Sequence, residues 1–304
     1  MKILHIGLMA TGGKGLDKAL KEKASEYFAI STSDPDLVSK ALEFDYDLCF
    51  LQIQSEKLNG QNTVEVLRPI VRKGFTINWN GDIRNATPKW MLELDVDVLA
   101  FSNQRDVDYA RTSNRRAEFL QIGIDPEIFK PLGTRRTDWD IVFFANSYGN
   151  MFPLGNLRKN VSGVLRSRYG SKFGLFGNGW NNASGNFNVQ NDDVDHWQGQ
   201  EAAIYRGSKI AISVSHYNVA RYTSDRLLRL MACGAFPLVH RFIGMEHDFN
   251  VGEQMVTFNH EHELPGIIDK WLDSDRDKIK KAAAEKILNN HTYDHMAQNI
   301  INMI

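Results

Sequence analysis

Short and almost wholly apolar runs recur along the chain, separated by stretches with helical spacing. Residues 46–53 read YDLCFLQI, and residues 139–145 read WDIVFFA. Runs this short and this apolar are typical of strands buried on both faces, as in a parallel sheet. Further strands are predicted at residues 2–8, 75–78, 96–101, 118–122, 173–176, 209–214, 236–239 and 254–258. Strands that alternate with helices predict an α/β fold built from doubly wound parallel sheets.

Helices are predicted between these strands, where apolar residues recur every three to four positions. The predicted ranges are 16–27, 63–73, 104–115, 155–169, 200–206, 261–273, 275–289 and 292–303. Another helix is expected to be capped by Asp34 and to begin at Pro35, because proline suits the first helical turn. Residues 181–197 are polar and aperiodic, which predicts a loop.

Residues 123–131, GIDPEIFKP, divide this series of strands and helices. Pro126 and Pro131 interrupt regular structure and stiffen the segment. The chain has 304 residues, which suffices for two domains of ordinary size. We therefore expect Rossmann-like domains at residues 1–124 and 132–290, joined by a linker at 125–131.

Composition narrows the function classes. The 36 basic and 37 acidic side chains nearly cancel, which argues against an overall electrostatic hold on nucleic acid. No run of about 18 apolar residues predicts a membrane span, and MKILHIGLMA is too short for a signal peptide and lacks a cleavage pattern. Cys49 and Cys233 both lie in apolar elements, which favours buried thiols over a disulfide. We expect a cytoplasmic protein.

Residues 224–239, SDRLLRLMACGAFPLV, predict an amphipathic helix that ends at Gly234 and passes into a strand. Ser224 or Asp225 is expected to be the N-cap. The start of such a helix can hold an anion, because its free N–H groups point outward there. In open α/β sheets, ligands bind at the carboxyl ends of the strands, and this helix start follows one.

The loop before this helix, HYNVARYTSDR from His216 to Arg226, is dense in donors and cations. We interpret it as a diphosphate site in which Arg221 and Arg226 clamp the oxygens and Ser224 bonds to them. Asp225 would repel phosphate, so it is expected to orient Arg226 or to cap the helix. The alternative is a surface loop with a salt bridge.

Two further strand-end loops contribute candidates to the same site. Asn146 is placed to hold a phosphate or a sugar hydroxyl, and Gly177 forms a turn. Trp180 either stacks on a nucleobase or sugar, or packs in the core. In the first half of the chain, Gly12 and Gly13 form either a tight turn or a close approach to a phosphate or acceptor.

Residues 79–84, WNGDIR, follow a predicted strand directly. Asp82 is either a turn residue and N-cap or a general base that takes a proton from an acceptor hydroxyl. Arg84 belongs to the same patch. Arginine and lysine side chains are also numerous between Arg105 and Lys172. They form either solvated helix faces or a surface that attracts an anionic acceptor.

Several of these pieces resemble the GT-B glycosyltransferases, and more closely their CgeB/YkvP-like group. The matching pieces are Arg226, Ala232 to Phe236 (ACGAF), Gly252 to Val256 (GEQMV), His291 to Tyr293 (HTY), the WNGDIR patch and the linker GIDPEIFKP. The resemblance implies two Rossmann-like domains that face each other across a cleft. It also implies that the last residues, 291–304, form a helix that packs back on the first domain.

The resemblance implies transfer of a hexosyl or pentosyl group from a nucleotide diphosphate sugar to an acceptor hydroxyl, without a metal ion or other cofactor. Arg226 would stabilise the leaving diphosphate, and Asp82 would be the base. Two positions depart from the family pattern, because Arg229 and Arg221 stand where acidic residues are expected. Arg229 either contacts phosphate instead or signals a different donor arrangement.

The acceptor is expected to be a glycan, a lipid or a modified base in DNA, as in phage enzymes of this fold. Two other functions stay open. The first is a GT-B protein that binds a nucleotide sugar without catalysis. The second is a Rossmann-type NAD-dependent enzyme, although the chain lacks G-x-G-x-x-G. Metal motifs such as CxxC, HExxH and DxD are also missing from the sequence.

Overall fold

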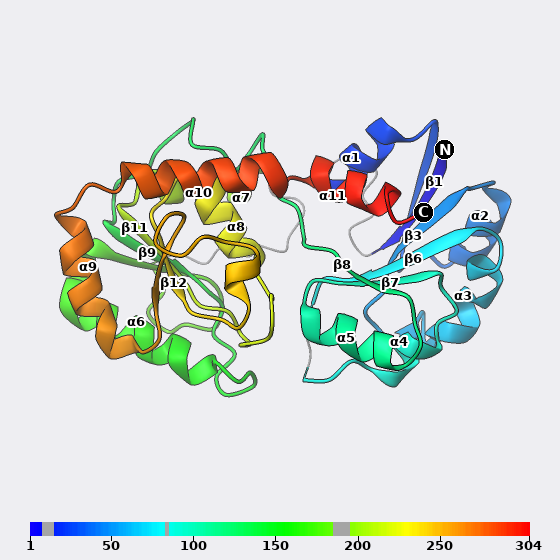
Figure 1. Ribbon diagram of the computed structural model, residues 1–304, viewed down its shortest axis with the longest axis horizontal. Helices are drawn as coiled ribbons and strands as arrows, with labels where there is room; N and C mark the ends of the chain where they lie inside the picture. The colour runs from blue at the N-terminus through cyan, green and yellow to red at the C-terminus, as the bar shows by residue number, and fades with distance from the viewer. Residues whose placement is uncertain (8–14, 83–84, 185–194) are drawn as a thin grey trace. The chain divides into compact units, whose positions relative to one another are not determined.

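The computed structural model of the protein describes residues 1–7, 15–82, 85–184 and 195–304. The chain forms two compact units. The first comprises Met1–Gly123 together with Tyr293–Ile304, and the second comprises Ile124–Thr292. Each has its own parallel sheet, as expected for a pair of Rossmann-like domains (Figure 1).

The sheet of the first unit has the strand order β2-β1-β3-β6-β7-β8, and all neighbouring strands are parallel. Its strands are β1 (Lys2–Gly7), β2 (Glu26–Ser31), β3 (Leu48–Gln52), β6 (Phe75–Asn80), β7 (Val98–Phe101) and β8 (Ala117–Phe119). A separate antiparallel pair is formed by β4 (Lys57–Leu58) and β5 (Gln61–Asn62).

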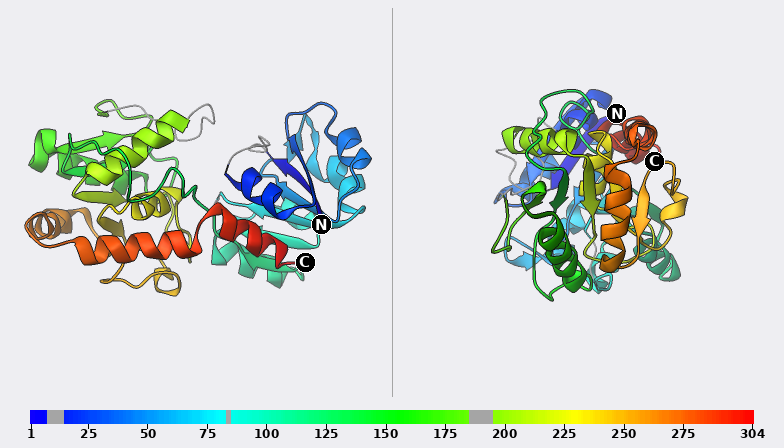
Figure 2. Two further views of the ribbon diagram at one scale, coloured as in Figure 1. Left: turned by 90° about the horizontal axis from the view of Figure 1, so that it is seen from above. Right: turned by 90° about the vertical axis from the view of Figure 1, so that its left-hand side faces the viewer.

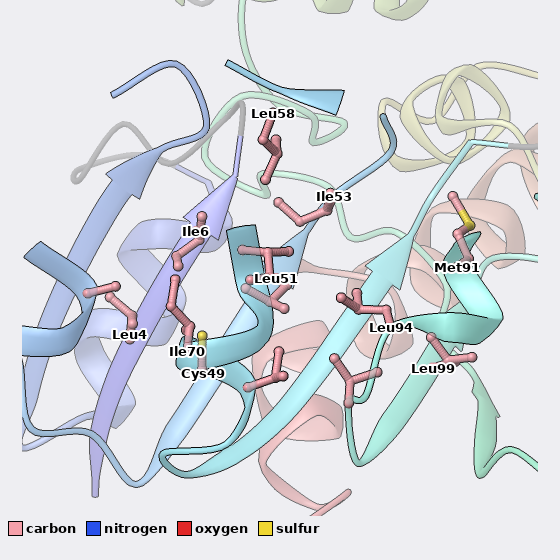
Figure 3. Close-up of a cluster of buried hydrophobic side chains, with 14 of the residues drawn as sticks. Leu4, Ile6, Cys49, Leu51, Ile53, Leu58, Ile70, Met91, Leu94 and Leu99 are labelled. Atoms are coloured by element: carbon pink, nitrogen blue, oxygen red, sulfur yellow. The ribbon is translucent and has the colours of Figure 1, made fainter. Parts of the chain in front are cut away.

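Helices cover both faces of this sheet, because successive strand residues point to opposite sides. Leu48 and Phe50 of β3 pack with one cluster, while Cys49 and Leu51 pack with the other (Figure 3). The first face is covered by α1 (Leu16–Lys23) and α11 (Tyr293–Ile301), which lie against each other (Figures 1 and 2). The second is covered by α2 (Leu37–Glu43), α3 (Thr63–Val71), α4 (Lys89–Glu93) and α5 (Gln104–Thr112).

The sheet of the second unit has the strand order β10-β9-β11-β12-β13 and is also wholly parallel. Its strands are β9 (Ile141–Phe144), β10 (Phe173–Phe176), β11 (Ile210–Ser213), β12 (Pro237–His240) and β13 (Val256–Phe258). This order reverses direction beside β9, because β10 lies on one side of β9 and β11 on the other. Ligands of open α/β sheets bind at the carboxyl edge near such a switch point.

Two helical layers enclose this second sheet. Phe143 and Ile212 pack with α6 (Gly155–Tyr169) and α9 (Leu264–Leu272). On the other face, Phe144 stacks on Phe176 with ring centroids 4.5 Å apart, and its ring also contacts Tyr205. This face is covered by α7 (Asp195–Gly207), α8 (Asp225–Ala232) and α10 (Asp277–Asn290) (Figure 1).

Several helix boundaries differ from the sequence predictions. The helix predicted at residues 16–27 ends at Lys23, because Ala24 is extended and the next residues form the edge strand β2. The helix expected from Pro35 begins at Leu37, while the Asp34 carboxylate accepts a hydrogen bond from the Asp36 N–H in the preceding turn. The loop predicted at residues 181–197 ends sooner, because α7 begins at Asp195.

The chain passes between the two units twice, at residues 123–124 and 292–293. Ile124 and Thr292 form a parallel β-bridge, and the Ile124 N–H donates to the His291 carbonyl at 2.9 Å. The following segment is tied to the second unit by Arg206, which donates to the carbonyls of Ile128, Lys130 and Thr134. No described helix has both the length and the apolar character needed to cross a membrane.

Candidate functional site

Helix α8 begins at the carboxyl edge of the second sheet, after the loop that follows β11. Ser224 is its N-cap, with Oγ accepting from the Leu227 N–H at 3.4 Å. The Asp225 carboxylate accepts from the Arg226 N–H at 2.8 Å. Both candidate caps therefore satisfy N–H groups of the first turn. Gly234 follows the helix in the left-handed conformation (φ 69°), as predicted for its C-terminal stop.

Arg158 of α6 is the most deeply buried cation at this edge, with 3% of its surface exposed. Its Nε and Nη2 donate to the Val214 carbonyl at 3.0 and 2.6 Å, and its Nη1 donates to the Asn146 carbonyl at 3.1 Å. These carbonyls follow β9 and β11, so the guanidinium joins two strand ends. Within the described parts of the chain it forms no ion pair with a carboxylate. Burial, aided by the charge of Arg226, lowers the pKa of Arg158 to about 9.

His216 lies beside this guanidinium, with Nε2 2.6 Å from Nη1 of Arg158. Because an arginine can only donate, this bond assigns the imidazole proton to Nδ1. Nδ1 is buried and has no hydrogen-bond partner among the described residues. Burial, with the charges of Arg158 and Arg226, lowers the pKa of His216 to about 3, so the ring is neutral at physiological pH.

Arg226 projects from the first turn of α8 into the same surroundings. Its charge acts on Arg158, His216 and Asp225. Its Nε atom is buried and lacks a hydrogen-bond partner in the described parts of the chain. Two guanidinium groups, a neutral imidazole and a helix N-terminus thus converge at one edge of the sheet.

The loops that follow β9 and β10 form one wall of this edge. The N–H of Ser147 donates to the Asn178 carbonyl at 2.8 Å, and Oδ1 of Asn146 accepts from the Asn178 N–H at 2.9 Å. Gly177 has φ 127°, and a Cβ there would lie 2.1 Å from the Ala145 carbonyl oxygen. Only glycine fits this approach. Asn146 and Gly177 therefore shape the wall next to Arg158.

Trp180 takes the core position that was one of its two interpretations. Its ring packs against the core between the sheet and α6 and α9. Its Nε1–H donates to the Ala145 carbonyl at 2.5 Å. These two contacts hold the turn that carries Trp180 in place.

The guanidinium of Arg221 is paired with a carboxylate. It adopts φ 59°, which is uncommon for a residue other than glycine, and its guanidinium donates to both oxygens of Asp248 at 3.1 and 2.7 Å. Its N–H also donates to the Ile243 carbonyl at 2.8 Å. This bidentate pair ties the 216–226 loop to the segment after β12. The clamp of Arg221 and Arg226 stays a prediction, and in this structure Arg221 is bonded to Asp248.

Arg229 lies one turn after Arg226 and points away from that pair, toward α7. It is 9% exposed, and its Nη1 and Nη2 lie 3.3 Å from Glu201 Oε2 and 3.0 Å from Asp225 Oδ2. Its guanidinium also lies over the ring of Phe129, 5.3 Å from the centroid. Burial alone would raise the pKa of Asp225, but Arg229 and Arg226 lower it below its ordinary value. Arg229 thus takes part in an ion-pair chain with Glu201 and Asp225.

Glu201 completes this ion-pair chain and was not identified from the sequence. It is 2% exposed, and burial raises its pKa while Arg229 acts in the opposite direction. Because its partner is 28 positions away on another helix, no local pattern marks the pair. Arg158 was one of the cations between Arg105 and Lys172 that were interpreted either as solvated helix faces or as a surface that attracts an anionic acceptor. Its spacing from Val161 and Leu165, which are buried, is the signal that places it on the inner face.

In the first unit, the WNGDIR patch begins within the last two residues of β6, and Asp82 is exposed just after the strand. Trp79 is buried, and its indole N–H donates to the Leu120 carbonyl at 2.8 Å. A Cβ on Gly81 would lie 2.4 Å from this ring, so glycine is needed for the chain to pass over it. Gly12, Gly13 and Arg84 lie outside the described residues.

The basic cluster between Arg105 and Lys172 is largely bonded to the protein itself. Arg115 donates to the carbonyls of Leu92, Leu94 and Val96 at and after the end of α4, and Arg168 pairs with Asp269. Such contacts fit the helix-face interpretation better than an open acceptor surface. Among the described residues, no group of three or more His, Cys, Asp or Glu side chains is arranged to hold a metal ion.

Both units of the protein are similar to known proteins. Residues 158–302 match a family model described as "Glycosyl transferase-like". The match begins at Arg158 and includes all of α8. No curated protein matches the sequence.

Solved structures match over the whole chain. Sucrose-phosphate synthase (tll1590) from Thermosynechococcus elongatus has a TM-score of 0.70 at 10% identity, covering 100% of this chain and 98% of its own. Anabaena Alr3699/HepE in complex with UDP has a TM-score of 0.63 at 13% identity, covering 100% and 99%. A glycosyltransferase from Rickettsia africae ESF-5 has a TM-score of 0.64 at 12% identity, covering 99% and 97%. The protein therefore has the GT-B fold of two Rossmann-like domains, and most of its second unit matches a glycosyl transferase-like family model.

Proposed function

We propose that this protein is a glycosyltransferase that moves a sugar from a nucleoside diphosphate sugar to an acceptor hydroxyl. Support comes from the family match over residues 158–302 and from the GT-B fold. Structures of Anabaena Alr3699/HepE with UDP and with UDP-glucose share that fold. The membership of the CgeB/YkvP-like group, inferred from the ACGAF and HTY pieces, belongs to the same proposal.

The observation that carries this proposal is the pair of guanidinium groups at the carboxyl edge of the second sheet. Arg158 is buried and forms no ion pair with a carboxylate among the described residues, and the charge of Arg226 acts on Arg158 as well as on Asp225 and Glu201. A desolvated cation without a counter-charge is unfavourable in an empty site. It becomes favourable when a diphosphate occupies the site, because each guanidinium can donate to two phosphate oxygens.

The proposed chemistry uses this charge on the leaving group. As the bond from the sugar to the diphosphate breaks, negative charge grows on the phosphate oxygens. Arg226, Arg158 and the N–H groups at the start of α8 would stabilise that charge more strongly in the transition state than in the bound donor. Neutral His216 would donate from Nδ1 without adding a third positive charge to the pair.

On the acceptor side we propose Asp82 as the base. It is exposed at the carboxyl end of β6, where ligands of an α/β sheet bind. A carboxylate there can take the proton that the acceptor hydroxyl loses as it attacks the sugar. We also propose that transfer needs no metal ion or other cofactor, because the two arginines supply the positive charge that a metal would provide.

The finer assignments are tested by one screen. The purified protein is incubated with UDP-, GDP- and dTDP-linked hexoses and pentoses, with and without a divalent metal, and its melting temperature and nucleotide release are measured. A ligand that binds the native state raises the melting temperature. Acceptors are then added as glycan, lipid and modified DNA, which also decides whether an anionic acceptor is used.

The screen separates the proposed enzyme from the two other functions. If a nucleotide sugar raises the melting temperature but no nucleotide is released, the protein binds the donor without catalysis. Stabilisation by NAD alone would favour the dehydrogenase class. Whether the protein works in the cytoplasm is tested separately by fractionating cells that express a tagged chain.

A further inference from the structure

The loop that carries Asp82 is held by the start of α5. The Ser102 hydroxyl donates to the Gly81 carbonyl at 2.8 Å, just before Asp82. Beyond it, Nη1 of Arg105 donates to the Asn85 carbonyl at 3.2 Å. The Thr87 hydroxyl donates to Oδ1 of Asp106 at 2.9 Å. The backbone is therefore fixed on both sides of the exposed carboxylate.

Asp106 is the centre of these contacts and is only 2% exposed. Its Oδ1 accepts from Nε and Nη2 of Arg105 at 2.9 and 2.8 Å in addition to Thr87, while its Oδ2 accepts from Nδ2 of Asn103 at 2.9 Å. Arg105 is thereby held in the geometry that lets its remaining nitrogen reach Asn85. A buried carboxylate that accepts this many bonds rigidifies its surroundings.

Capping of α5 does not account for this arrangement. Asn103 is the N-cap, and its side chain already accepts from the Asp106 N–H at 2.9 Å. The three donors on Oδ1 add nothing to the first turn of the helix, and the threonine among them comes from the loop. Among the described residues of the loop, Asn85 and Ala86 are exposed. Polar contacts from α5 and from Ser102 reach Gly81, Asn85 and Thr87.

We propose that Asp106 and Arg105 are positioning residues that hold the Asp82 loop in the geometry needed for acceptor activation. The inference rests on the proposed function, because it acts through Asp82. A base must lie within hydrogen-bond reach of the hydroxyl that it deprotonates, and small misplacements reduce the rate strongly. Rigid support from a helix supplies that placement.

The first test measures the loop itself and needs no substrate. Hydrogen exchange of residues 81–88 is compared in the wild type, Asp106→Ala and Thr87→Val. Asp108→Ala is the matched control, because Asp108 is an exposed carboxylate on the same helix that accepts from Gln104 rather than from the loop. We expect exchange to rise about tenfold in the loop for the first two variants and to stay unchanged in the control.

The second test measures transfer. We expect Asp106→Ala to lower kcat about tenfold or more, with the dissociation constant for UDP unchanged within about twofold, because the proposed diphosphate contacts lie in the second unit. If Asp106 acts through Asp82, the double variant Asp82→Asn/Asp106→Ala is no slower than Asp82→Asn alone. Losses that multiply in the double variant would overturn the positioning role.

A result that contradicts the positioning role can be distinguished from a result that contradicts the proposed function. Unchanged loop exchange in Asp106→Ala, or acceleration spread evenly over α5 and β7, would overturn the inference whatever the activity. If the wild type transfers no sugar, the proposed function fails, and the exchange measurement still decides whether α5 fixes the loop. Should Asp106→Ala not fold, Thr87→Val provides the same comparison, because it removes one donor without altering α5.

Discussion

Two arginines one turn apart on α8 are used in opposite ways. Arg229 is buried between the carboxylates of Glu201 and Asp225. The charge of Arg226 acts on Arg158, whose guanidinium is bonded to carbonyls and to an imidazole rather than to an acid. In the first region the cation is paired with two carboxylates. In the second, Arg158 has no carboxylate partner among the described residues, although the charge of Asp225 acts on it.

The difference separates structural cations from cations kept for a ligand. Burying an ion pair removes both charges from water, and the attraction between the two charges offsets part of this desolvation cost. When a cation is buried alone, nothing offsets the cost. Buried charges without such compensation are concentrated at functional sites. Type and position in the sequence do not distinguish Arg226 from Arg229, but the charge of the neighbouring side chains does.

Removing Arg229 gives the largest expected change in stability. Arg229→Met leaves Glu201 buried without its partner, so the free energy of unfolding should fall by about 3–5 kcal/mol. Urea denaturation measures this. The double variant Glu201→Gln/Arg229→Met removes both charges and should recover much of the loss. If Arg229→Met is as stable as the wild type, the ion-pair chain is not structural.

Removing Arg226 should affect the reaction instead. Arg226→Ala is expected to lower kcat by about 100- to 1000-fold, because one stabilising donor of the leaving group is lost. Its urea midpoint should stay near that of the wild type. Arg168→Ala is the control, since that exposed arginine pairs with Asp269 on the outer side of α6. Full turnover in Arg226→Ala would remove the diphosphate assignment.

Arg158→Met is the direct counterpart of Arg229→Met and should cost less. The carbonyls of Val214 and Asn146 lose donors, but a desolvated charge disappears with them, so we expect a loss of about 1 kcal/mol. If the nucleotide sugar of the proposed function raises the melting temperature of the wild type, that rise should be absent from this variant. A destabilisation equal to that of Arg229→Met would show that the two regions do not differ.

The smallest expected effect is a pH dependence that arises from His216. Its pKa is lowered from 6.5 to about 3 by burial and by the neighbouring arginines. The unfolded chain therefore takes up a proton near pH 6.5 that the native state does not bind until about pH 3. The free energy of unfolding should fall as the pH drops through this interval. His216→Gln should lose less over the same interval, and parallel curves would argue against a buried neutral ring.

The sequence predicted the alternating architecture well, because buried parallel strands are nearly continuous apolar runs. The predicted bounds of α6 and β10 agree with the structure. Strand β2 was assigned partly to a helix because it lies at the sheet edge and its residues are only partly buried, which weakens the apolar signal. Such elements depend on their neighbours in space more than on their own residues.

The site was predicted in outline but not in its pairings. The α8 start and Arg226 followed from a local pattern of cap, cation and glycine. Arg221 and Arg229 were included because they are cations nearby, yet Asp248, the partner of Arg221, lies 27 positions away, and Glu201, one of the two partners of Arg229, lies 28 positions away. Arg158 lies 68 positions before Arg226 in the sequence. Contacts over such separations are fixed by the order of strands in the sheet, which the sequence pattern does not specify.

The placement of α11 affects how the protein is made. Met296, Ala297, Ile300 and Met303 belong to the core of the first unit, packed with Leu16 and Leu20 of α1. During translation, residues 1–123 emerge first but still lack this part of their core. The second unit, contained within residues 124–292, has all its residues available sooner. We therefore expect the first unit to complete its folding after the second, with the apolar face beside α1 open to chaperones until residues 293–304 have left the ribosome.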